Sequence, residues 1–165
     1  MPKRPWNRVN LPVYSISSKD KQGNCNMHII TYASQISMQP KRFICGIFEG
    51  TKTLELVEKN PTFILQLLNE TQYRLVDLLG KKSGNNIDKI ARLNKRQLLT
   101  EWNGFLILKD ALAVMLLNAS SVIPNLNVEQ GDHRMFLCDV VDYKNLNDGN
   151  PLTLDVLRQH KLIRI

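Results

Sequence analysis

The chain has 165 residues, of which 43% are hydrophobic and 22% charged, proportions typical of a globular protein and not of a disordered segment. No apolar run approaches the ~20 residues that a membrane-spanning helix needs, and the N-terminal MPKRPWNRVN carries no apolar region of a signal peptide. We therefore expect a cytoplasmic protein of one domain, 1–165, that does not associate with membranes.

The net charge of +7 permits nucleic-acid binding, but the basic residues are scattered along the chain. Aromatic residues make up only 7%, so platforms on which bases could stack are scarce. A basic surface that attracts phosphates or dinucleotides fits at least as well. We predict no nucleic-acid partner; the alternative, a basic nucleic-acid-binding β barrel, would bind oligonucleotides in a salt-sensitive way.

The cysteines predict neither a disulfide framework nor a metal site. Cys25, Cys45 and Cys138 are odd in number, show no C-x-x-C spacing and lie in or beside apolar strand-like runs. We interpret them as buried small hydrophobic residues. The three histidines are not paired with them at the spacing of zinc ligands, so we predict no metal.

The N-terminal third is predicted to form three strands. Residues 6–18 read as an extended lead-in and a first strand, and the polar segment 19–23 reads as a hairpin turn. The second strand is expected from Asn26 to Ser34. Gln39-Pro40 ends it, and the apolar run RFICGIF over 42–48 predicts a third strand.

Two helix starts follow. The segment 50–53 is expected to open a short helix with Leu54 and Val57 facing inward, which stops at Asn60-Pro61 because the residue before a proline disfavours helix. A strand is predicted over 62–68. After it, Asn69 and Gln72 have the spacing of a capping box and predict a helix that ends at Gly80.

The C-terminal half is predicted to be mostly strand. A short helix is expected around 87–91, and strands are expected over 105–108, 111–122 and 135–143. A final helix is expected from Thr153, as its cap, to Leu162. Six or seven short strands with few helices predict a mainly β fold, an antiparallel barrel with peripheral helices. No G-x-G-x-x-G or G-x-x-x-x-G-K-[ST] occurs, so a Rossmann fold or P-loop is not supported.

Three short motifs suggest a phosphate-bearing aromatic ligand. Thr51-Lys52-Thr53 would offer two hydroxyls and an ammonium at a helix N-terminus, although plain helix capping explains it as well. The small and hydroxyl residues of 31–34 would let a flat ring approach the backbone, or would face water on a surface strand. His133, after Gly131-Asp132, could hydrogen-bond a cofactor edge or be a structural turn residue.

Taken together, these segments resemble the flavin reductase-like family of FMN-binding split barrels, which includes flavoredoxins. The resemblance extends over about 8–152. It is carried by short motifs in a fixed order, namely Asn26, Thr31 to Ser34, Ser37-Met38-Gln39-Pro40, Phe43 to Phe48, Thr51-Lys52-Thr53, Phe63 to Asn69, Gly131-Asp132-His133 and Pro151-Leu152. The chain departs from the family pattern at Ile29, where threonine is frequent, and at Lys41, where a second proline is common.

The resemblance implies FMN held noncovalently at a homodimer interface, NADH or NADPH as electron donor, and a further electron acceptor. It places the flavin ring along Thr31, Tyr32, Ala33 and Ser34, and the phosphate at Thr51, Lys52 and Thr53. Asn26, Met27 and His28 would line the ribityl chain or the ring edge. His133 is the implied catalytic residue, near the ring, where it would stabilise reduced flavin. Hydride transfer requires the nicotinamide and flavin rings to stack at about 3–3.5 Å.

Two related functions stay open at this point. One is a split-barrel protein that holds FMN or a similar ligand without turnover. The other is an enzyme similar to pyridoxamine-phosphate oxidases, which share the barrel and FMN. The Gly131-Asp132-His133 turn favours the reductase branch.

Overall fold

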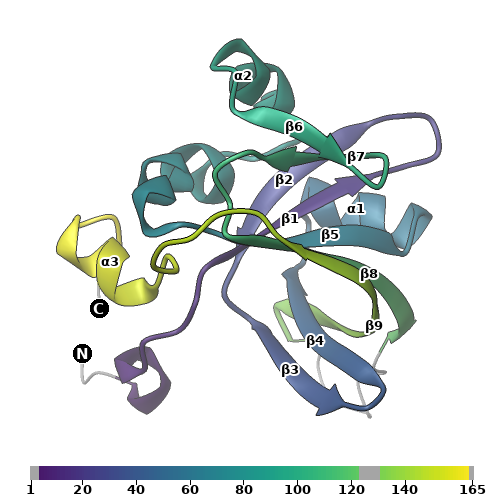
Figure 1. The fold of residues 1–165 in the computed structure, drawn as a ribbon, viewed down its shortest axis with the longest axis horizontal. Coiled ribbons are helices and arrows are strands. Elements are labelled where there is room, and N and C mark those ends of the chain that lie inside the picture. The colour runs from purple at the N-terminus through teal and green to yellow at the C-terminus, as the bar shows by residue number, and fades with distance from the viewer. Residues whose placement is uncertain (1–3, 123–130, 164–165) are drawn as a thin grey trace.

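The computed structural model describes residues 4–122 and 131–163, and within them a seven-stranded antiparallel sheet curls into a barrel (Figure 1). The strands of this sheet run in the order β2-β1-β5-β8-β9-β4-β3. Their bounds are β1 Tyr14–Lys19, β2 Cys25–Ile30, β3 Ala33–Met38, β4 Lys41–Phe48, β5 Thr62–Leu67, β8 Ala113–Val122 and β9 His133–Asn145. A separate hairpin is formed by β6 Leu99–Trp102 and β7 Phe105–Leu108. The mainly β, split-barrel expectation is confirmed.

The predicted second strand over 26–34 is wrong as a single element, because the chain divides it. β2 ends at Ile30 and β3 begins at Ala33, at opposite edges of the sheet. Between them, the Tyr32 carbonyl accepts a hydrogen bond of 2.7 Å from the Gly46 N–H on β4. A strand period of two describes both halves equally well, so the alternation of side chains could not reveal the break.

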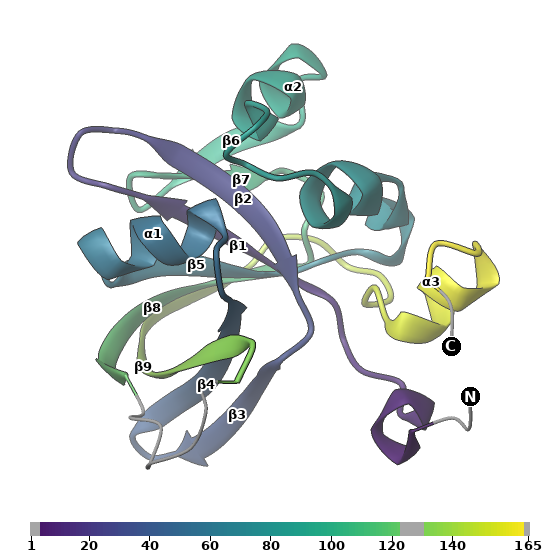
Figure 2. The ribbon, with the colours of Figure 1, turned by 180° about the vertical axis from the view of Figure 1, so that it is seen from behind.

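The helices cover the ends and one outer side of the barrel (Figure 2). They are α1 Lys52–Lys59, α2 Lys89–Lys95, α3 Leu154–Gln159, the 3₁₀ segments Pro5–Arg8 and Glu70–Leu75, and a π-helical turn over Asp77–Lys81. The capping box of Asn69 and Gln72 is confirmed. The Gln72 side-chain oxygen accepts a hydrogen bond from the Asn69 N–H, and the Asn69 side chain accepts one from the backbone of the following turn. Gly80 lies inside the π turn and does not end a helix.

Several boundaries differ from the expected ones. The lead-in contains a 3₁₀ turn, because Pro5 is suited to a first helical position. β6 was missed within a segment read as polar and basic. His133 is the first residue of β9 and not a residue ahead of it. Thr153 makes no side-chain cap at α3; instead Asn10 Oδ1 accepts the Asp155 N–H at 2.9 Å.

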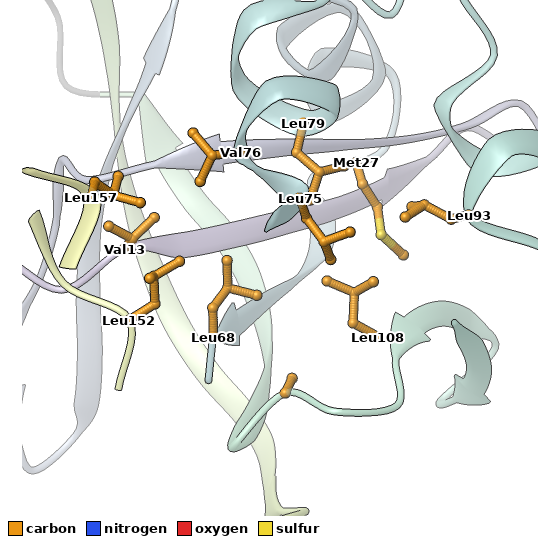
Figure 3. Close-up of a cluster of buried hydrophobic side chains, with 11 residues drawn as sticks. Val13, Met27, Leu68, Leu75, Val76, Leu79, Leu93, Leu108, Leu152 and Leu157 are labelled. Atoms are coloured by element: carbon orange, nitrogen blue, oxygen red, sulfur yellow. The ribbon is translucent and has the colours of Figure 1, made fainter. Parts of the chain in front are cut away.

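Two large apolar cores and a third, smaller one hold these layers together. Inside the barrel, Leu54 and Val57 of α1 pack with Ile16, Ile47, Phe63 and Leu117. The prediction that Leu54 and Val57 face inward is confirmed. Outside, Met27, Leu68, Leu79 and Leu93 join side chains from the helical segments (Figure 3). Cys45 and Cys138 are fully buried as predicted, whereas Cys25 is half-buried.

None of the helices in the described part of the chain is long and apolar enough to cross a membrane.

Candidate functional site

The main cavity has a volume of about 660 Å³ and opens where the junction of β2 and β3, the start of α1 and the segment 80–84 meet. Seven of the residues predicted from sequence line it, from four separate parts of the chain. They are Asn26, His28, Thr31, Tyr32, Thr51, Lys52 and His133. The barrel topology therefore brings the proposed ring side and the proposed phosphate side into one space.

An aromatic cluster forms one wall of the cavity. The ring centroid of Tyr32 lies 4.6 Å from that of His133, and Phe48 meets the same histidine edge-on at 5.2 Å. Gly46 permits this close approach, because a Cβ there would lie 3.2 Å from the Tyr32 Cβ and 3.0 Å from the Met135 sulfur. Tyr32 and Phe48 remain exposed, so this wall offers aromatic surface to a flat ligand.

His133 is fixed by its neighbour. Its Nδ1 lies 2.7 Å from Asp132 Oδ1, and this hydrogen bond lowers the pKa of the Asp132 carboxyl. Because an ionised carboxylate only accepts hydrogen bonds, Nδ1 is the donor of this bond, and Nε2 is left outside it.

The start of α1 forms the opposite side of the cavity. Thr51 caps the helix: its hydroxyl oxygen accepts the Leu54 N–H at 3.2 Å and donates to the Phe48 carbonyl at 2.9 Å. Lys52 is paired with Glu55 at 3.3 Å. The capping explanation of this motif is thus correct, and it leaves the Lys52 ammonium and the unpaired N–H groups of the first turn facing the cavity region.

Asn26 connects α1 to the segment 81–88. It is 4% exposed, and its Nδ2 donates to Thr53 Oγ1 at 3.0 Å. On its other side the backbone of Gly84 comes so close that a Cβ on that residue would lie 2.4 Å from Asn26 Oδ1. Asn26 therefore requires a glycine at position 84.

His28 on β2 is half-buried, and one of its ring nitrogens is withdrawn from solvent. Its Nδ1 is buried and has no hydrogen-bond partner within the described residues. Burial, with Lys89 and His133 nearby, lowers the pKa of His28 to about 4. The ring is therefore neutral at pH 7 and holds an uncommitted nitrogen at the cavity wall.

This shift predicts a pH-dependent stability. Above pH 6.5 the ring is neutral in both states; as the pH falls towards 4 the unfolded chain takes up the proton first, so stability decreases. Between pH 7 and pH 5 we expect His28 to account for a loss of about 2 kcal/mol in the free energy of unfolding. Urea unfolding at both pH values should show this loss, and His28→Asn should remove it. An equal loss in the variant would contradict the assignment.

Lys89 is a site residue that the sequence analysis missed. Its side chain is 2% exposed, it lines the cavity, and its Nζ donates to the Leu79 carbonyl at 2.9 Å. No carboxylate among the described residues pairs with it, and burial lowers the pKa of the amine to about 8. A usable signal existed: Lys89 precedes the buried Leu93 by four residues and thus occupies the apolar face of α2.

Four of the predicted binding residues do not line the cavity. Met27 is fully buried in the outer core (Figure 3). Ala33 packs against the barrel core, and Ser34 is exposed with its hydroxyl donating to the Gln35 carbonyl. Thr53 is buried behind Asn26. The alternation of side chains along β2 turns Met27 away from the cavity that its neighbours Asn26 and His28 line.

The cavity has the parts that a phosphorylated flat ligand needs. It has an aromatic wall, a buried lysine with uncommitted N–H donors, and an orphaned histidine nitrogen. Among the described residues, no three His, Cys, Asp or Glu side chains gather as a metal site would require. The chemistry of these residues fits a phosphorylated flavin such as FMN.

Comparison with known proteins agrees with this geometry. The family model of the flavin reductase like domain matches residues 6–161. The chain belongs to this family. The family resemblance drawn from the sequence motifs is thus confirmed.

Individual relatives are distant. The high molecular weight rubredoxin of Moorella thermoacetica is 29% identical over 150 residues, covering 90% of this chain and 62% of that protein. This flavin reductase-like chain thus spans less than two thirds of the curated relative. Among solved structures, an FMN-binding protein from Thermus thermophilus has a TM-score of 0.72 at 23% identity, covering 92% of this chain and 83% of the other. The flavin reductase PheA2 has a TM-score of 0.71 at 22% identity, covering 93% of each chain.

Proposed function

We propose that the chain binds FMN noncovalently in the main cavity and passes electrons from NADH or NADPH to an acceptor, as a flavin reductase or a flavoredoxin-like carrier. The observation that carries the proposal is the joining of Tyr32 and His133 with Lys52 and Lys89 around one cavity of about 660 Å³. The names of the similar structures, an FMN-binding protein and a flavin reductase, support the same ligand.

Each part of the wall has a role in this proposal. Lys52 and Lys89 hold the phosphate, together with the N–H groups at the start of α1. Tyr32 and Phe48 support the ring and exclude water from one face. Asp132 would hold the His133 ring beside the bound cofactor, where a hydrogen bond from the ring would stabilise negative charge. When bound, the flavin supplies hydride acceptance and electron release.

Partners include a second copy of the chain. Large apolar side chains are exposed along β3 and β9, at Ile36, Met38, Val141 and Tyr143. Met38 and Tyr143 line a further hollow of about 400 Å³, whose wall also includes Tyr14, Phe43 and Met115. Monomers rarely leave apolar residues gathered in this way, so the face supports the proposed homodimer.

The test is a visible titration followed by reduction. Purified protein mixed with FMN should bind it and become yellow, and anaerobic NADH or NADPH should then bleach the flavin absorbance over many turnovers when excess FMN is supplied. Binding without bleaching by either nucleotide would favour the alternative of a flavin-binding protein without turnover. Failure to bind FMN would overturn the proposal.

A further inference from the structure

A carboxylate lies in the wall of the main cavity. Glu49 lines this cavity two residues before Thr51, at the start of α1 where the proposed function places the FMN phosphate. The phosphate is an anion, and like charges close together in a partly buried site repel each other. A cavity that binds a phosphate there needs a cation that cancels the charge of Glu49.

Arg134 on β9 supplies this cation. Its Nη2 lies 3.1 Å from Glu49 Oε1, and its Nε donates to the same oxygen at 3.2 Å. A guanidinium that contacts a carboxylate through two nitrogens fixes its orientation as well as cancelling its charge. Within residues 4–122 and 131–163, no other lysine or arginine lies within ion-pair distance of Glu49, and Lys52 is paired with Glu55 instead.

The same arginine connects three elements around the cavity. Its Nη1 donates to Glu58 of α1, while Glu49 belongs to the turn 49–51 between β4 and α1. The Glu49 N–H also donates to the Asp132 carbonyl at 2.9 Å, directly before His133 and Arg134. The start of α1 is thus tied to the start of β9, so its position relative to His133 depends on Arg134.

We propose that Arg134 is a positioning residue of the FMN site, which cancels the charge of Glu49 and holds the turn 49–51 so that the cavity accepts a phosphate. The inference rests on the proposed function, since it concerns how the site selects FMN over a flavin without phosphate. Arg134 is absent from the cavity wall and therefore acts through Glu49. Half-exposed ion pairs add little to stability, so its effect belongs to ligand selection more than to folding.

The main test compares FMN with riboflavin, both titrated by flavin fluorescence. Arg134→Met removes the charge and keeps a long side chain. We expect the preference for FMN over riboflavin to fall about tenfold, because Glu49 then repels the phosphate without a counter-charge. In about 1 M salt, where charges are screened beyond about 3 Å, most of this loss should disappear.

Further variants separate the charge from the structure. Glu49→Gln added to Arg134→Met removes the uncovered charge and should restore most of the preference for FMN. Arg134→Lys keeps a cation and should lose less than about threefold. The matched control Lys59→Met lowers the net charge by the same amount at the exposed end of α1, outside the cavity wall, and should leave the preference unchanged.

Each outcome bears on the inference. Equal losses for FMN and riboflavin in Arg134→Met, or a loss that Glu49→Gln does not restore, would overturn it and leave the proposed function intact. If Arg134→Met does not fold, Glu49→Gln alone decides: the freed guanidinium should raise the preference for FMN, and an unchanged or lower preference overturns the inference. Failure of the parent protein to bind FMN contradicts the proposed function, and the inference with it.

Discussion

Replacing Lys89 with methionine is expected to weaken FMN binding by about 10- to 100-fold, the loss that follows removal of a charge-assisted hydrogen bond to phosphate. Methionine has a similar length and fills the same apolar surroundings, so the site keeps its shape. The measurement is a fluorescence titration with FMN and with riboflavin, which lacks the phosphate. Riboflavin affinity should be nearly unchanged; an equal loss for both ligands would contradict a phosphate role.

The control for this variant is Lys95→Met on the same helix, because Lys95 is exposed and lines neither the main cavity nor the adjoining hollow of about 550 Å³. Stability provides a second check. Since burial lowers the pKa of Lys89 to about 8, the folded state below that pH carries an unfavourable buried charge that the unfolded chain does not. Lys89→Met should therefore be at least as stable as the parent protein at pH 7.

The same pKa gives the direction of the pH dependence of binding. As the pH rises through about 8, Lys89 in the free protein loses its proton, and FMN affinity should begin to fall. Riboflavin affinity should show no such decrease, and the Lys89→Met variant should lose the decrease for FMN. A fall of the same size in the variant would assign the titration to another group.

Replacing Gly84 with alanine is expected to lower the free energy of unfolding by about 1–3 kcal/mol, the cost of forcing extra volume into a packed site. The added Cβ would lie 2.4 Å from Oδ1 and 2.9 Å from Cγ of Asn26, which is too close for either group to remain in place. Asn26 is buried and bonded to Thr53, so its displacement also disturbs the start of α1. FMN affinity should fall with stability, as measured by urea unfolding and by titration.

A matched control is Gly131→Ala, where the added methyl group meets no atom of the described residues within 4 Å. Its free energy of unfolding should stay within about 0.5 kcal/mol of that of the parent protein. A companion variant, Asn26→Ala with Gly84→Ala, removes the clash and should restore part of the loss of Gly84→Ala. If Gly84→Ala alone is as stable as the parent protein, the close approach of residues 26 and 84 is not what positions this segment.

Both variants concern the segment 80–89, which the flavin reductase-like family assignment by itself would not single out. This segment closes the main cavity with Lys81, Lys82 and Gly84 and supplies the buried Lys89. It also forms much of the wall of an adjoining hollow of about 550 Å³. The affinity and the choice of nucleotide are therefore expected to depend on it more than on the strands of the barrel.

Local signals in the sequence determined much of the fold and part of the site. Short apolar runs predicted β5 and β7, the capping box at Asn69 was found from its spacing alone, and Thr51 was placed correctly at the start of α1. These features depend on hydrogen bonds and on side-chain patterns within a few residues, so they can be predicted from the sequence alone. The order of the short motifs was enough to indicate the family.

Only the tertiary structure decided which of the candidate residues share one cavity. Met27 turns away because side chains alternate along β2, whereas Ala33 and Ser34 lie beyond the break at 31–32, where the chain crosses from one edge of the sheet to the other. Lys89 and the orphaned nitrogen of His28 became visible only through burial, which depends on contacts between distant segments. Asn26 contacts both Thr53 and Gly84, which lie 27 or more residues away in the sequence. Long-range packing fixes these contacts, so no local sequence pattern predicts them.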